Sequence, residues 1–418
     1  MDPVTHGIAG ALIGKAFFAN QNSSANQASQ SLNRTSVARV AIFAATLGAV
    51  FPDVDIFVDA FSKDPLGIAR YHRGFTHSFV GLPIFAVVLA ALTRAFFLWY
   101  AKRPGREDWT PPSFAFLFAI YAAGIASHII LDGFTSFGTR MLNPFSKDRV
   151  AWDFLFIIDF TLTALLLVPQ LAAWVHQSRE NGRKRASAVW VFLTLSALAV
   201  WALARVAEFP FHLLPAIVAS GIFAAVLFMP IWRGFGACIS RTRWCQAGFC
   251  LSCAYIIACG FAHHAAMSRV RAFASRQHIS AENIGAMPMP ISFLHWDGLI
   301  LTPNGVYQST FCLRDTTDPA FRFFADSPSN RYIQEARGLE PVETFLWFSR
   351  FPLVHFTEND GKHVVEYTDM RFFTGDKGQP MPFLFYVSFD SEGKMLNYGF
   401  VGRAPRFSRD SASSSNRQ

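Results

Sequence analysis

The chain contains 418 residues, of which 52% are hydrophobic and only 16% are charged. Soluble proteins average about 25% charged residues, so this composition is typical of a membrane protein and argues against an ordinary soluble enzyme. The net charge of +8 arises mostly in short loops between apolar runs, and no basic tail or aromatic-studded basic face indicates a nucleic-acid partner. We therefore expect a membrane protein that binds no nucleic acid.

Apolar runs predict about eight membrane-spanning helices, because one span needs about 20 residues. The runs cover residues 4–19, 37–57, 79–100, 114–131, 154–175, 188–206, 211–232 and 247–266. The first run is short, so seven spans are the alternative. Residues 1–176 are expected to contain five spans and residues 177–266 the additional transmembrane helices. Residues 20–33, between the first two runs, are polar and predict a flexible loop.

Lysine and arginine residues in the loops predict the orientation. Loops that follow odd-numbered spans carry twelve of them and loops that follow even-numbered spans carry six, so the odd loops are expected in the cytoplasm. The N-terminus and the loops that hold His72, His77 and Asp132 then face outward. An even number of spans places the C-terminal region on the same extracytoplasmic side.

Residues 267–407 predict a soluble domain that is mainly antiparallel β. Short alternating runs occur at residues 291–301, 344–349, 364–370, 383–389 and 396–401. They are separated by turn sequences at residues 303–305, 359–361, 376–378 and 391–393, and Asn-Gly and Asp-Gly between such runs are hairpin signals. One helix is expected near residues 330–337, and His295-Trp296-Asp297 is expected on a half-buried strand. The tail 408–418 is expected to be disordered.

Two pairs of residues are the first candidates for a metal site: a histidine with an aspartate, and two aspartates. His128 and Asp132 are four residues apart, which places them on one helical face, one turn apart. They fit a shared ion or a carboxylate that orients the imidazole, and a buried hydrogen-bonded pair is the alternative. Asp53 and Asp55 lie where the second run meets water and repel each other unless a cation or proton lies between them. Exposed loop carboxylates are the alternative.

A short basic loop supplies further candidates. His72 and His77 offer two imidazoles, and Arg73 suits a phosphate or carboxylate, although a loop that binds lipid headgroups is the alternative. His6 alone is a weak signal, and Asp153 fits either a further ligand or a helix N-cap. Because the candidates come from four segments and lie at one membrane face, a shared metal site is favoured over an unrelated origin for each residue. The set is His6, Asp53, Asp55, His72, His77, His128 and Asp132.

These motifs resemble those of a known family. In order and spacing they match the pattern of the YdjM-like membrane-bound metal-dependent hydrolases over about residues 1–175. The matching runs are Thr5-His6-x-x-x-Gly10, Phe51-Pro52-Asp53-x-Asp55, His72-Arg73-Gly74-x-Thr76-His77-Ser78 and His128-x-x-x-Asp132. The resemblance implies a multi-pass inner-membrane protein and a metal-dependent hydrolase. The clustered ligands are also distantly similar in style to those of zinc-dependent phospholipases C, which hints at phosphoester chemistry.

The expected function is therefore hydrolysis of a lipid or lipid-linked (phospho)ester at the outer face of the inner membrane. The seven residues would hold one to three divalent ions, with zinc favoured, and a bound water would be the nucleophile. Asp55 or Asp132 would accept a proton, and Arg73 would neutralise developing charge. A non-enzymatic transporter or lipid-binding scaffold is the alternative. It predicts polar residues at mid-bilayer depth, of which spans six to eight carry few.

Overall fold

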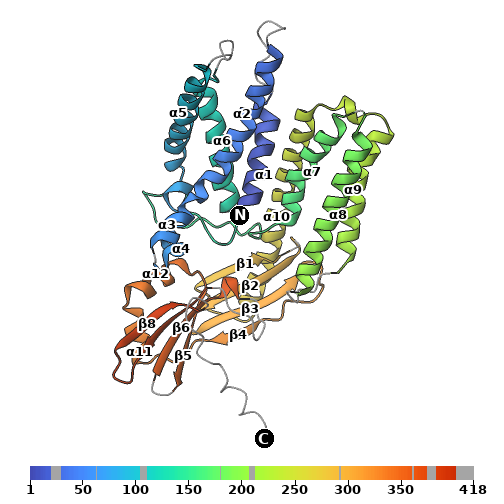
Figure 1. The fold of residues 1–418 in the computed structure, drawn as a ribbon. Coiled ribbons are helices and arrows are strands. Elements are labelled where there is room, and N and C mark those ends of the chain that lie inside the picture. Colours follow the sequence, from blue (N-terminus) through green and yellow to red (C-terminus); the bar gives the residue numbers. More distant parts are fainter. Residues whose placement is uncertain are drawn as a thin grey trace. The chain divides into compact units, whose positions relative to one another are not determined.

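The computed structural model describes residues 1–19, 30–62, 64–103, 111–178, 180–206, 212–290, 293–359, 362–373 and 383–401 (Figure 1). The chain divides into two compact units. The first comprises Met1–Val54, Phe75–Ala151 and Ile157–Ala258. The second comprises Asp55–Gly74, Trp152–Phe156 and Cys259–Gln418. The second unit therefore combines the C-terminal region with two short segments from the N-terminal half.

The first unit is helical. In chain order its elements are α1 (Pro3–Ile13), the π-helical turn η1 (Gly14–Phe18), α2 (Gln30–Val50), the 3₁₀ turns η2 (Phe51–Val54) and η3 (Phe75–His77), α5 (Gly81–Ala101), α6 (Phe114–Gly133), α7 (Phe160–His176), α8 (Gly182–Val206), α9 (Leu214–Trp232) and the first half of α10 (Arg241–Arg276). Helices α1, α2, α5 and α6 form one group, and α7, α8 and α9 another (Figure 1).

Six helices of the described chain are long and apolar enough to cross a membrane. They are Val37–Val58, Gly81–Ala101, Phe114–Gly133, Gly182–Val206, Leu214–Trp232 and Arg241–Arg276. The expectation of about eight spans is therefore not confirmed. The run 4–19 forms α1, which has 11 residues before the π-helical turn, and the run 154–175 forms α7, which has 17. A span takes about 17–25 residues, so α1 is too short for a straight span and α7 is at the lower limit.

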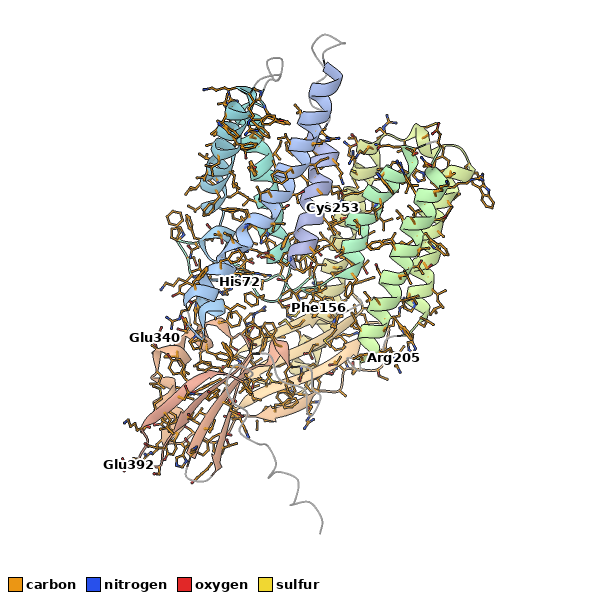
Figure 2. The ribbon with its side chains drawn as sticks, in the orientation of Figure 1. His72, Phe156, Arg205, Cys253, Glu340 and Glu392 are labelled. Atoms are coloured by element: carbon orange, nitrogen blue, oxygen red, sulfur yellow. The ribbon has the colours of Figure 1, made fainter. Side chains whose placement is uncertain are left out.

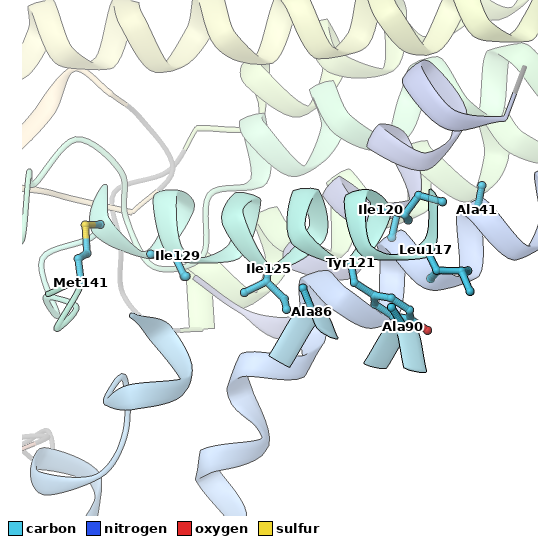
Figure 3. Close-up of a cluster of buried hydrophobic side chains, with 11 residues drawn as sticks. Ala41, Ala86, Ala90, Leu117, Ile120, Tyr121, Ile125, Ile129 and Met141 are labelled. Atoms are coloured by element: carbon cyan, nitrogen blue, oxygen red, sulfur yellow. The ribbon is translucent and has the colours of Figure 1, made fainter. Parts of the chain in front are cut away.

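Small residues let α2 and α6 pack closely, and this contact positions the candidate site. A Cβ on Gly124 of α6 would lie 2.6 Å from the carbonyl oxygen of Ala45 in α2. Close approach of helices through small residues is the usual packing mode in membranes, where lipid supplies no hydrophobic driving force. Around this contact, Ala41, Tyr121 and Ile125 contribute to a fully buried apolar core (Figure 3).

The second unit contains two four-stranded sheets in which neighbouring strands are antiparallel. The first has the order β1 (Asn283–Pro288), β2 (His295–Thr302), β3 (Gly305–Cys312) and β4 (Arg322–Ala325). The second has the order β5 (Pro352–Asn359), β6 (Lys362–Asp369), β7 (Leu384–Phe389) and β8 (Met395–Phe400). Helices α11 (Arg331–Arg337) and α12 (Glu340–Phe348) connect the sheets, and α3 (Asp55–Ser62) and α4 (Gly67–Arg70) belong to the same unit.

The expected antiparallel β region is confirmed, with corrections in detail. Strands at 364–370, 383–389 and 396–401 correspond to β6, β7 and β8, and part of 291–301 forms β2. The helix near 330–337 is α11, whose first turn is capped by the Asn330 side chain. The sequence did not predict β1, β3, β4 or β5. The turn 376–378, the tail 408–418 and residues 20–29 of the expected loop lie outside the described residues, whereas residues 30–33 belong to α2.

The expected strand at 344–349 is wrong, because most of this segment belongs to α12. Val342, Phe345 and Phe348 are buried at a spacing of three residues, which is the period of a helix and not of a strand. The half-buried strand expected at 295–297 is also corrected. His295 is exposed, but every residue from Trp296 to Ile300 is buried, so both faces of β2 are covered.

Candidate metal centre

Four side chains from three segments of the first unit converge at one end of its helices. They are Asp53 in η2, His77 in η3, and His128 and Asp132 in the last turns of α6. Asp53 is 10% exposed and the other three side chains are fully buried. Each can offer one ligand atom, and the four atoms lie within 4.8 Å of one another.

Four of the distances within this cluster are those of a tetrahedral ion site. The Nε2 atoms of His77 and His128 each lie 3.4 Å from Asp53 Oδ1 and 3.4 Å from Asp132 Oδ2. Ligands bound at about 2.0–2.2 Å around a tetrahedral centre are separated by about 3.3–3.6 Å. The two Nε2 atoms are closer to each other, at 3.0 Å, so they would move slightly apart around an ion. The four donor atoms thus lie close enough together to share one small divalent ion.

The hydrogen bonds of the two imidazoles favour this use. His128 Nδ1 lies 2.6 Å from the carbonyl oxygen of Ala49, which can only accept, so Nδ1 donates and the neutral ring carries its lone pair on Nε2. His77 Nδ1 lies 3.0 Å from the Thr76 hydroxyl, which leaves its Nε2 for the cluster. Metal-binding histidines characteristically use the second ring nitrogen in this way. Asp53 Oδ2 is buried and has no hydrogen-bond partner among the described residues, as expected of a group that awaits a cation.

Local backbone structure explains how the two turns reach the cluster. Pro52 lies in η2, where the regular α2 helix has ended, and this change of path directs Asp53 inward. On the other side, η3 runs directly against the start of α5. A Cβ on Gly81 would collide with the carbonyl oxygen of Phe75, so only glycine permits the approach that places His77.

His6 lies beside the four-residue cluster. Its side chain is fully buried, its Nε2 is 3.2 Å from Asp132 Oδ1, and its ring stacks on His128 with centroids 3.7 Å apart. The α-amino group of Met1 also contacts Asp132 Oδ1. Asp2 caps α1 by accepting from the backbone N–H of Thr5, which fixes the helix start next to these groups.

The remaining predicted site residues, Asp55, His72 and Arg73, contact one another in the second unit. His72 Nδ1 lies 2.9 Å from Asp55 Oδ1, and the backbone N–H of Arg73 donates to Asp55 Oδ2 at 2.9 Å. Asp55 therefore orients the histidine, and it links the beginning of the segment Asp55–Gly74 to its end. Arg73 has a positive φ of 59° and a buried side chain, a conformation that is uncommon for a residue other than glycine.

Asp153 does not cap a helix. Both its carboxylate oxygens accept from Arg350 Nη1 at 3.0 Å, within the second unit. Asp159 instead caps α7, and its other oxygen accepts from Tyr255. Sequence reasoning missed the Ala49 carbonyl, because a backbone oxygen has no signature in the residue pattern. Thr76 stands in the motif that the sequence analysis quotes, but its role as the partner of His77 Nδ1 became apparent only in the structure.

A comparison with known families covers the part of the chain that holds this site. The model of the YdjM inner membrane protein family matches residues 1–209, which is half of the chain and includes every predicted site residue. The chain belongs to the YdjM family. The matched stretch of this family member runs from α1 through α8, and it contains all four residues of the cluster. The family description names an inner membrane protein, and the six apolar helices of the described chain fit a multi-pass membrane protein.

One relative is similar over a shorter stretch. The "Uncharacterized protein YfhP" of Bacillus subtilis (strain 168) is 31% identical to this YdjM family member over 112 residues, which are 27% of this chain and 30% of the relative. The match thus spans less than a third of the relative's length. No solved structure matches the chain.

Proposed function

We propose that this YdjM family member is a membrane-bound metal-dependent hydrolase. The observation that carries the proposal is the convergence of four donor atoms of Asp53, His77, His128 and Asp132 within 4.8 Å of one another, with the two imidazole Nε2 atoms 3.0 Å apart and each 3.4 Å from an oxygen of both carboxylates. Imidazole nitrogen and carboxylate oxygen are the ligands that zinc prefers when thiolates are absent. A divalent ion held by these four residues, with a water molecule as a fifth ligand, would supply a Lewis acid and lower the pKa of that water towards about 7.

The protein's own residues would orient the reaction. Asp132 contacts both histidines of the cluster and His6, so it is the carboxylate best placed to accept and return a proton. Asp55 is the other candidate base, and in its own unit it holds His72 and the backbone of Arg73. The Arg73 guanidinium would neutralise charge that develops on a phosphoryl or carbonyl oxygen. We propose that Asp55 and His72 contribute to further ion binding, for a total of one to three ions.

The depth of the cluster suggests the class of substrate. Asp132 is the penultimate residue of α6, and Asp53 follows closely after α2, so the cluster lies at helix ends and not at their centres. Helix ends in a membrane protein lie near the lipid headgroups. A lipid or lipid-linked ester, with a phosphoester favoured, is therefore the proposed substrate. The excess of basic residues in the opposite loops supports an extracytoplasmic site in the inner membrane.

The test is metal content and hydrolysis by the purified full chain in detergent. We expect about one or more zinc ions per chain by elemental analysis, and loss of most of this metal in the double variant His77→Ala and Asp132→Ala. The matched control is His264→Ala with Asp148→Ala, because both side chains are exposed and lie outside the cluster. Radiolabelled phospholipids should release a product that disappears with chelator. Unchanged metal content in the cluster variant would refute the site, and metal without hydrolysis would favour a transporter or scaffold.

A further inference from the structure

The segment Asp55–Gly74 leaves the helical unit and folds with the C-terminal domain. It contains α3 and α4, and it groups with Cys259–Gln418 in the second compact unit. We refer to its described residues, 55–62 and 64–74, as the strap. The strap packs through α4 against α12 of the C-terminal domain. The C-terminal domain thus holds a piece of the N-terminal half of the chain.

Leu66 anchors the strap in the domain's apolar core. Its side chain has no solvent exposure and shares one core with Phe345 of α12 and with Tyr367 and Phe385 of the second sheet. Removal of a whole leucine side chain from water is one of the larger contributions that a single residue makes to folding. The backbone before it is fixed as well, because the N–H of Leu66 donates to Asp64 Oδ1 at 2.9 Å.

A second contact ties the strap to the start of α12. The Arg70 guanidinium forms an ion pair with Glu340, and its Nε lies 3.3 Å from Asp64 Oδ2. Glu340 is labelled in Figure 2 at the first turn of α12, and His72 is labelled two residues beyond the end of α4. Because the ion pair is largely exposed to water, it contributes little to stability. Its effect is to orient α4 relative to the start of α12.

Both ends of the strap lead by a short covalent path into the candidate metal centre. Asp53 stands two residues before Asp55, and His77 stands three residues after Gly74. Two or three residues of extended chain reach at most about 7–11 Å, so little slack separates the strap from either ligand. The carboxylate of Asp55 also contacts His72 and accepts from the N–H of Arg73. These contacts join the first residue of the strap to residues near its end.

We propose that the C-terminal domain positions the metal centre through the strap. This inference rests on the proposed metal site and assigns the C-terminal domain a role in it. Leu66 and Glu340 are positioning residues: they hold the strap, and the two ends of the strap continue directly into the turns that carry Asp53 and His77. Coupling of this kind is reciprocal, so metal binding should in turn stabilise the strap on its domain.

The experiment compares two truncations in the same apolar core of the full chain. Leu66→Ala removes the strap's anchor, whereas Val365→Ala removes a fully buried side chain of β6 that belongs to the same core but not to the strap. Zn²⁺ affinity is measured by competition with a chromophoric chelator, and amide hydrogen exchange is measured across the chain. We expect Leu66→Ala to weaken Zn²⁺ binding by about tenfold or more, as loss of outer support does in metal sites, and Val365→Ala to weaken it much less.

The exchange measurement does not depend on metal binding. In metal-free protein we expect faster exchange at Phe51–Val54 and Phe75–His77 in Leu66→Ala than in Val365→Ala, because only the former releases the strap. Addition of Zn²⁺ to the wild type should slow exchange at Gly67–Arg70. Equal exchange at the two turns in both variants would overturn the positioning role. A wild type that binds no Zn²⁺ but shows the expected exchange difference would refute the proposed metal site alone.

A milder pair of variants covers the case in which Leu66→Ala does not fold. Glu340→Gln removes the partner of Arg70, and Glu343→Gln changes another exposed carboxylate of the same helix. We expect a smaller change in the same direction for Glu340→Gln, with faster exchange at Phe75–His77, and no change for Glu343→Gln. Identical behaviour of these two variants, with Leu66→Ala unfolded, would also count against the role of the strap.

Discussion

Asp297 shows what a single buried acid does to the C-terminal domain. It lies on β2 with 4% exposure, and one oxygen accepts from Gln308 Nε2 at 2.7 Å while Oδ1 has no hydrogen-bond partner among the described residues. Burial raises the pKa of Asp297 to about 7, and the Gln308 hydrogen bond offsets only part of this effect. The folded domain therefore prefers the protonated acid, whereas the unfolded chain ionises near pH 4.

This predicts a pH-dependent stability of the first sheet. Below about pH 4 the acid is protonated in both states and costs nothing, and above about pH 7 the full cost of burying the charge is present. Between these values the free energy of unfolding should fall by up to about 1.4 kcal/mol per pH unit. Asp297→Asn should abolish this fall and make the domain more stable than the wild type at pH 8. Hydrogen exchange of the β2 and β3 amides, corrected for intrinsic exchange rates, measures the free energy of unfolding at each pH.

The control for Asp297 is Glu392→Gln, because Glu392 is exposed in the turn between β7 and β8 (Figure 2). It should leave the pH dependence of β2 and β3 unchanged. A wild type whose β2 amides are equally protected at pH 5 and pH 8 would show that Asp297 is not the titrating group.

At the scale of elements, the packing of α2 on α6 decides whether the metal ligands meet. His128 and Asp132 lie on α6, whereas Ala49, which accepts from His128, and Asp53 lie at the end of α2 and just beyond it. His128 and Ala49 are 79 positions apart in the chain, so nothing local holds them together. The contact at Gly124 sets the distance between the two helices.

We expect Gly124→Ala to destabilise the helical unit and to weaken metal binding. The new methyl group would lie 2.6 Å from the Ala45 carbonyl oxygen, and overpacking of this kind costs about 1–3 kcal/mol. Gly221→Ala in α9 is the matched control, because nothing lies within 4 Å of the position that its new methyl group would take. Thermal unfolding and Zn²⁺ titration in detergent measure both effects. Equal behaviour of the two variants would show that helix spacing at Gly124 is not critical.

At the scale of the whole molecule, the proposed ion should behave as a stabilising ligand. An ion that binds only the folded state stabilises it by about 2.7 kcal/mol when its free concentration is 100 times its Kd. We therefore expect chelator to lower the apparent Tm of the wild type and added Zn²⁺ to restore it. In the His77→Ala and Asp132→Ala variant, neither treatment should change the Tm. A wild type that is insensitive to chelator would contradict a bound structural or catalytic ion.

Much of the architecture was predictable because its signals are local. Hydropathy over about 20 residues marks a membrane helix, and Asn-Gly or Asp-Gly between alternating runs marks a hairpin. The same local reasoning failed where neighbours decide the outcome. The run 154–175 looked long enough to span, but Asp159 starts α7 only at Phe160. The run 344–349 alternated like a strand, but its large apolar residues bury one helical face of α12.

The sequence by itself determined the ligand types, the pairing of His128 with Asp132 and the membrane character of the chain, since each depends on composition or on spacing within one turn of helix. The sequence also predicted that Asp53 and His77 gather with that pair at one membrane face. Only the tertiary structure decided how closely their ligand atoms approach, that Asp55 and His72 belong with the C-terminal domain, and that Leu66 lies in its core. These contacts join residues far apart in the chain. They follow from how closely helices and sheets pack, and no single segment carries that information.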